Sequence, residues 1–102
     1  MKIIQCIAKR IAEEIGDADT YINLATEWKA EQPEAAEVFF DLSTEEMKHA
    51  DMLHEVETKL ISEYREANGD PPKAMLALYD YLHGQEIENA MRVKVKQGMY
   101  KA

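Results

Sequence analysis

The feature that most constrains the fold of this chain is the spacing of its apolar residues, which recur every three or four positions over almost its whole length. That spacing is typical of α-helices that bury one face. The sequence has 102 residues but only 4 Gly and 3 Pro, and 46% of it is apolar, which favours a folded helical protein over a disordered chain. We therefore expect one all-α domain covering residues 1–102.

The first break in the pattern separates two helices that should pack as a hairpin. The apolar spacing predicts a helix over residues 3–29. Pro33 suits the first turn of a second helix, and its ring disfavours helical geometry at Gln32. The second helix is therefore expected to begin near Pro33 and to run antiparallel to the first.

The second break is the segment EANGDPP, residues 66–72. Asn68-Gly69 is a typical helix stop, Asp70 is a candidate cap, and Pro71 is a candidate first-turn residue of the next helix. A third helix with a broader and less regular apolar surface is predicted over about residues 72–99. The chain is thus predicted to form a helical hairpin followed by a third long helix.

Polar side chains occupy expected core positions in both helices of the hairpin. Glu14 interrupts the apolar stripe of the first helix, and Glu46 and His49 interrupt that of the second. The apolar members of the two stripes are Ile7, Ile11, Ala18, Tyr21, Ala25 and Trp28, and Ala35, Phe39, Leu42, Leu53, Val56 and Leu60. A carboxylate removed from water needs a cation, a hydrogen-bond donor or a proton. A bound metal ion would meet that need.

Counting residues from the turn places the three polar side chains at one level of the hairpin. Glu14 lies about 15 residues before the turn and Glu46 about 13 after it, which at 1.5 Å per residue is roughly 20 to 22 Å along each helix. His49 lies one turn beyond Glu46 on the same face, because residues three apart on a helix are neighbours. The three side chains are therefore expected to converge.

On these residues the sequence resembles the ferritin-like carboxylate-bridged di-metal proteins, in the manner of rubrerythrins and the short encapsulated ferritins. The resemblance rests on Glu14, on Tyr21 and on Glu46-x-x-His49, and it covers about residues 7–60. It implies Fe as the cofactor, with Mn or Zn as competitors, and oxidation of Fe(II) by dioxygen or peroxide. It also implies Glu46 as a bridging ligand, Glu14 and His49 as terminal ligands, and Tyr21 as a hydrogen-bond partner of a ligand.

The resemblance is incomplete in an informative way. Full-length members carry the ligand pattern twice in one chain, whereas the third helix here has no second copy. Two chains related by a twofold axis would supply four carboxylates and two imidazoles. We therefore expect a homodimer or larger homo-oligomer in which dimerisation completes a four-helix bundle with the site at the interface. The resemblance to short encapsulated ferritins also makes an encapsulating shell a candidate partner.

Other interpretations of the same residues remain open. The sequence STEE, residues 43–46, could be a capping box in which Ser43 begins a new helix. Glu14 could instead form an ion pair with Lys or Arg in a dimer interface. Tyr21 and Trp28 are first of all core aromatics, and Tyr21 acquires a role at the site only if the metal is present.

Further titratable residues lie outside the expected site. The third helix holds His83 and Glu86, whose order is opposite to that of the family motif, so we expect a surface pair and keep both as secondary candidates. His54 lies five residues after His49, which turns it away from the face of the site and should leave it exposed. Glu13 and Glu45 are expected to face solvent.

Charge and cysteine content narrow the function. A formal charge of −8 argues against nucleic-acid binding, which requires clustered Lys and Arg. Charges interrupt the apolar start of the chain too early for a signal or membrane segment, and the lone Cys6 can form no internal disulfide, so a cytoplasmic protein is expected. Without a Cys-x-x-Cys pair for electron transfer, a ferroxidase is favoured over a peroxidase with its own reductant site. The rival is a non-catalytic helical interaction or structural protein, in which a metal is absent or only staples a dimer.

Overall fold

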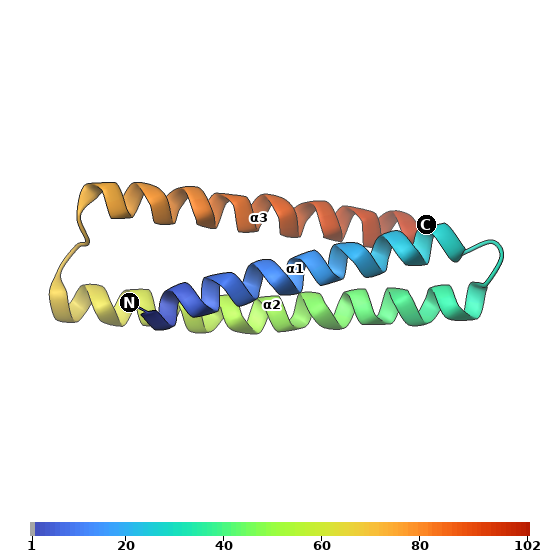
Figure 1. Cartoon of the computed structure of the whole chain (residues 1–102), viewed down its shortest axis with the longest axis horizontal. Helices are drawn as coiled ribbons and strands as arrows, with labels where there is room; N and C mark the ends of the chain where they lie inside the picture. The colour runs from blue at the N-terminus through green and yellow to red at the C-terminus, as the bar shows by residue number, and fades with distance from the viewer. Residues whose placement is uncertain (1) are drawn as a thin grey trace.

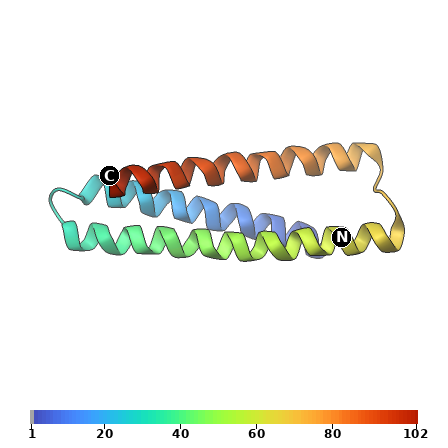
Figure 2. The ribbon, with the colours of Figure 1, turned by 180° about the vertical axis from the view of Figure 1, so that it is seen from behind.

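The computed structural model describes residues 2–102 and consists of three long helices joined by short connections (Figure 1). The helices are α1, Lys2–Trp28; α2, Pro33–Asn68; and α3, Lys73–Lys101. α1 and α2 pack as an antiparallel hairpin, and α3 runs along it to form a rod of 55 × 19 × 18 Å (Figure 2). The expected ferritin-like all-α fold, a hairpin plus a third long helix, is confirmed. Among the described residues no helix combines the length and apolarity needed to cross a membrane.

The ends of α2 lie where the sequence predicts them. The helix begins at Pro33, whose missing N–H would have no partner in the first turn. It ends at Asn68, and Gly69 follows with a φ of 76°, a left-handed conformation that glycine adopts without steric cost. The Gly69 N–H donates to the carbonyl of Arg65 and so closes the last turn.

The start of α3 differs from the prediction. The helix begins at Lys73 with Pro72 in the N-cap position, so Asp70 and Pro71 belong to the connection and Asp70 is not the cap. The physical reason is the pair of prolines, because each proline disfavours helical geometry in the residue before it. Pro72 itself stays extended, with φ −53° and ψ 147°, and its carbonyl accepts the first hydrogen bonds of α3.

The core runs along one face of α1 against small residues of α2. Its buried apolar residues are Ile4, Ile7, Ile11, Ile15, Ala18, Ile22 and Ala25 of α1, Ala36, Met47 and Ala50 of α2, and Val93 and Tyr100 of α3. The predicted core face of α2 is only partly correct. Phe39, Leu53 and Leu60 of the predicted stripe pack against the core, but the apolar residues of α2 that are buried, Ala36, Met47 and Ala50, lie beside that stripe. Small residues at the contact let the two helices approach closely, which the apolar count alone does not reveal. Trp28, predicted as a core aromatic, is 38% exposed.

One buried hydroxyl joins all three helices. Ser43 lies in the middle of α2, donates to the carbonyl of Ala18 at 2.7 Å and accepts from the side-chain amide of Gln97 at 2.9 Å. Because α2 is continuous through this residue, the capping-box interpretation of residues 43–46 is wrong.

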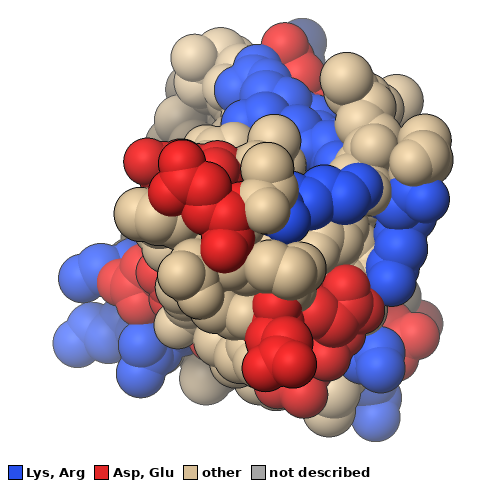
Figure 3. All heavy atoms as spheres, turned by 90° about the vertical axis from the view of Figure 1, so that its right-hand side faces the viewer, with Lys and Arg blue, Asp and Glu red and all other residues tan. Residues whose placement is uncertain are grey.

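The C-terminal end of α3 is fastened beside the turn between α1 and α2. The ring of Tyr100 stacks on Phe40 with centroids 4.9 Å apart, and Lys29 donates to the Tyr100 carbonyl. Lys101 pairs with Glu37 at 3.1 Å. Figure 3 looks onto this end and shows basic and acidic groups interspersed, with no single sign of charge covering the face. Elsewhere α3 packs chiefly on α1 and touches α2 little.

Candidate metal centre

Glu14 of α1 and Glu46 and His49 of α2 lie together at one level of the hairpin. His49 Nδ1 is 3.6 Å from Glu14 Oε2 and 3.8 Å from Glu46 Oε2. One donor atom from each of the three residues lies within 4.8 Å of the others. The structure thus brings together the three side chains that residue counting placed at the same distance from the turn. We refer to them as the hairpin cluster.

Two carboxylates are crowded in the hairpin cluster. A hydrogen bond with Glu14, then burial, then the charge of Glu14 raise the pKa of Glu46 from 4.5 to about 7, and the charge of His49 acts in the opposite direction. Glu46 therefore retains a proton close to neutral pH, which a bound cation would displace. Within the described chain no Lys or Arg pairs with Glu14. Two carboxylates and one imidazole form a donor set that suits Fe(II), Mn(II) or Zn(II), so the residues fit the metal that the resemblance implies.

The hairpin cluster lies at the edge of the core and faces outward. The exposed fraction of the side chain is 24% for Glu14, 20% for Glu46 and 55% for His49. The neighbouring Glu13 and Glu45 are fully outside the core, as expected. The three side chains are therefore accessible from solvent at the edge of the hairpin.

Tyr21 is not part of the hairpin cluster in this structure. It lies about two turns along α1 from Glu14, or roughly 10 Å at 1.5 Å per residue. Its half-buried ring stacks on Phe39 with centroids 6.4 Å apart. Within the described chain its hydroxyl makes no hydrogen bond to the cluster, so its role beside a ligand stays a prediction.

A second group of donors lies between α2 and α3. We call it the α2–α3 cluster, and its members are His54, Glu57, His83 and Glu86. The expectation that His54 is exposed is wrong, because its half-buried ring stacks on His83 with centroids 4.9 Å apart. Neither Glu57 nor the meeting of the two helices here was predicted from the sequence. The available signal was a repeated spacing, since His-x-x-Glu occurs once in α2 and once in α3.

Comparison with known proteins agrees with the geometry. The family model described as Rubrerythrin matches residues 6–100 of the chain, a range that includes both clusters. No curated protein and no solved structure shows a significant match. Rubrerythrins typically bind iron, and the carboxylate and histidine groups described above are candidate ligands. Since the match covers nearly the whole of it, the chain belongs to the rubrerythrin family, whose members are di-iron carboxylate proteins.

Proposed function

We propose that this protein is a ferroxidase, which oxidises Fe(II) with dioxygen or peroxide at a di-iron site formed between two copies of the chain. The observation that carries the proposal is the hairpin cluster, half of a di-iron ligand set converging on a partly exposed face. A second copy would bring the total to four carboxylates and two imidazoles. Such oxidation would serve iron storage or removal of oxidants.

The surface around the hairpin cluster supports a second copy as the missing half. Phe39, Leu42 and Leu53 lie on the same stripe of α2 and are only half-buried, and Val56 is 48% exposed. An apolar stripe with ligands in its middle is costly to leave in water, and an isologous dimer would cover it and complete the site at once. The same contact would form the four-helix bundle from two hairpins. A larger homo-oligomer and an encapsulating shell remain compatible with it.

The residues of the hairpin cluster have separable roles in this reaction. Fe(II) is the substrate, and the bound ions supply the electrons that reduce the oxidant. Glu46 would release its proton as Fe(II) binds and then lie between the two ions, while Glu14 and His49 would each hold one ion from the side. Tyr21 would donate a hydrogen bond that orients a ligand. The family resemblance, rather than the measured distances, supports this division between bridging and terminal ligands.

The first experiment measures binding of anaerobic Fe(II) and then oxygen consumption after air is admitted. Wild-type protein should bind Fe(II) and oxidise it faster than buffer does, and Glu46→Ala combined with His49→Ala should reduce the rate to that of buffer. Glu45→Ala, at an exposed neighbouring position on α2, is the matched control and should react like wild type. A double variant that consumes oxygen as fast as wild type would contradict the proposal. Binding of Fe(II) without faster oxidation would instead favour a non-catalytic protein in which the metal only links two chains.

A second experiment tests whether the site is shared between chains. Wild-type chains are co-refolded in equal amounts with the Glu46→Ala, His49→Ala chain. If both halves are needed, random pairing leaves about a quarter of the wild-type activity rather than half. Retention of half would place a complete site within one chain and refute the shared site.

A further inference from the structure

The α2–α3 cluster is built from two matching turns that face each other. His54 and Glu57 lie three residues apart on α2, and His83 and Glu86 repeat this spacing on α3, which runs in the opposite direction. One donor atom from each of the four residues lies within 4.8 Å of the other three. His54 is five residues from His49, which turns it by roughly 140° around α2 from the hairpin cluster at 3.6 residues per turn. Glu57, however, is eleven residues from Glu46 and lies within about 20° of it around the helix, so the two clusters are separated mainly along α2, by about two helical turns.

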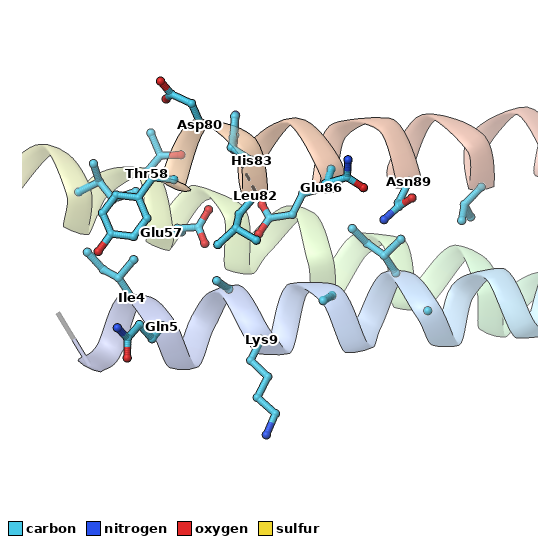
Figure 4. Close-up of a pocket in the computed structure, with 18 of the residues that line it drawn as sticks. Ile4, Gln5, Lys9, Glu57, Thr58, Asp80, Leu82, His83, Glu86 and Asn89 are labelled. Atoms are coloured by element: carbon cyan, nitrogen blue, oxygen red, sulfur yellow. Dashed lines mark ion pairs between the residues drawn. The ribbon is translucent and has the colours of Figure 1, made fainter. Parts of the chain in front are cut away.

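The carboxylates of the α2–α3 cluster are largely buried and accept no hydrogen bond within the described chain. Glu57 is only 6% exposed, and within the described chain it makes neither a hydrogen bond nor an ion pair. Glu86 Oε2 is likewise buried with no hydrogen-bond partner, and the nearest imidazole nitrogen, His83 Nδ1, is 3.9 Å away. Figure 4 shows Glu57, His83 and Glu86 directed into the same groove, which has a volume of about 820 Å³. A carboxyl group in such surroundings either keeps a proton or needs a counter-charge.

Two arginines, Arg65 and Arg92, line the groove, but within the described chain no Lys or Arg pairs with Glu57 or Glu86, and Arg92 pairs with Glu88 instead. Lys9 lines the same groove, but its side chain extends away from the cluster (Figure 4). Burial raises the pKa of Glu57, and burial together with the charge of Glu57 raises the pKa of Glu86 to about 7. The only positive charge that the cluster itself can provide is protonation of its two imidazoles. A cation from solution would satisfy all four residues at once.

We propose that the α2–α3 cluster binds one divalent first-row transition-metal ion with four protein ligands, and that Zn(II) fits it best. Two imidazoles and two carboxylates are ligands that Zn(II) accepts in a tetrahedral arrangement. Bonds of about 2.05 Å give a tetrahedron with edges of about 3.3 Å. His54 Nε2 and His83 Nδ1 already lie 3.4 Å apart, which matches one such edge. The two rings stack nearly parallel, so both the imidazoles and the carboxylates would rotate to direct their donor atoms at one ion.

The position of the cluster indicates what the ion would do. α3 touches α2 little, and here the two helices meet through the stacked rings of His54 and His83. An ion with two ligands from each helix would cross-link them in the half of the molecule away from the anchored C-terminus. The site is therefore structural, with no ligand position reserved for substrate.

The test uses full-length protein carrying Glu46→Ala and His49→Ala, so that the hairpin cluster cannot contribute. Titration with Zn(II) against a chromophoric chelator should show one ion bound per chain, and Co(II) should give the intense visible bands of a tetrahedral ion. Adding Glu57→Gln and Glu86→Gln should weaken Zn(II) binding by more than about 100-fold, since loss of groups that merely orient ligands already costs about 10- to 100-fold. His83→Asn alone, at a side chain that is 45% exposed, should weaken binding while leaving the fold intact.

Two comparisons decide the result. Glu55→Gln with Glu88→Gln changes the same number of charges at exposed positions on the same helices and should leave Zn(II) affinity unchanged. Far-UV circular dichroism of each variant establishes that it is folded. Absence of tight Zn(II) binding in the starting variant, or equal affinity after the cluster substitutions, would overturn the proposal. Because the hairpin cluster is disabled throughout, either result is independent of the ferroxidase proposal.

Discussion

Replacing Glu86 by Gln should stabilise the metal-free protein at pH 8 and change it little at pH 5. The side chain of Glu86 is only 12% exposed, and its Oε2 atom has no hydrogen-bond partner in the described chain. Burial, followed by the charge of Glu57, raises its pKa from 4.5 to about 7. Gln has nearly the shape of a protonated Glu and cannot ionise, so the variant avoids the buried charge that wild type acquires at high pH.

The sign and size of the effect follow from proton linkage. The folded chain holds this proton more tightly than the unfolded chain, so the associated stability is fully present below pH 4.5 and is lost as the pH rises through 7. The interval from 4.5 to 7 corresponds to at most about 3.5 kcal/mol, at roughly 1.4 kcal/mol per pH unit. Residual exposure and the neighbouring imidazoles reduce this value. We expect the gain of the variant over wild type to grow by about 1 to 3 kcal/mol between pH 5 and pH 8.

Urea unfolding measured by far-UV circular dichroism in EDTA tests this expectation. Both proteins are compared at equal concentration, because association would make the midpoint depend on concentration. Glu88→Gln, at an exposed position two residues away, should show the pH dependence of wild type. If the stability of Glu86→Gln has the same pH dependence as that of wild type, the Glu86 carboxyl is not desolvated in the folded chain and the reasoning is refuted. With saturating Zn(II) at pH 8, wild type should become more stable than Glu86→Gln, since only wild type keeps all four ligands.

Two further predictions concern the core. Ser43→Ala removes the hydroxyl shared by the three helices and should lower the free energy of unfolding by about 1 to 3 kcal/mol, whereas Thr44→Ala, whose hydroxyl bonds within its own helix, should cost under about 1 kcal/mol in the same urea titration. Ile11→Ala, at a side chain only 2% exposed, should cost about 2 to 5 kcal/mol, and Ile3→Ala, at one 56% exposed, should cost less than about 1 kcal/mol. Equal losses within either pair would contradict the packing described above.

The ends of the helices, and which positions of the hairpin lie opposite each other, could be predicted because they depend on local chemistry. Pro33 and Asn68-Gly69 mark the ends of α2 through properties of single residues, and both marks are correct. The rise per residue then fixes which positions of an antiparallel hairpin meet, whatever their side chains. That is why Glu14 could be matched with Glu46 and His49 before any packing was known.

The faces of the helices were harder to predict. α2 is apolar over a wide arc, and the part that contacts α1 is selected by small residues such as Ala36 and Ala50 rather than by hydrophobicity. The α2–α3 cluster depends on the rotation of α3 about its own axis. The connection through Pro71 and Pro72 and the packing of Val93 on α1 set that rotation, and neither is encoded in the spacing of His83 and Glu86.

The uneven attachment of α3 has a consequence for how the molecule opens. Its fully buried residues, Val93 and Tyr100, both lie in its last third, whereas its first half meets α2 mainly where His83 stacks on His54. The least costly partial unfolding therefore detaches the first half of α3 and leaves the hairpin intact, so amide hydrogens there should exchange with solvent first. When the first half of α3 packs back onto the hairpin, the four donor residues of the α2–α3 cluster come together in the same step. Any ion held there would set the lifetime of the closed form.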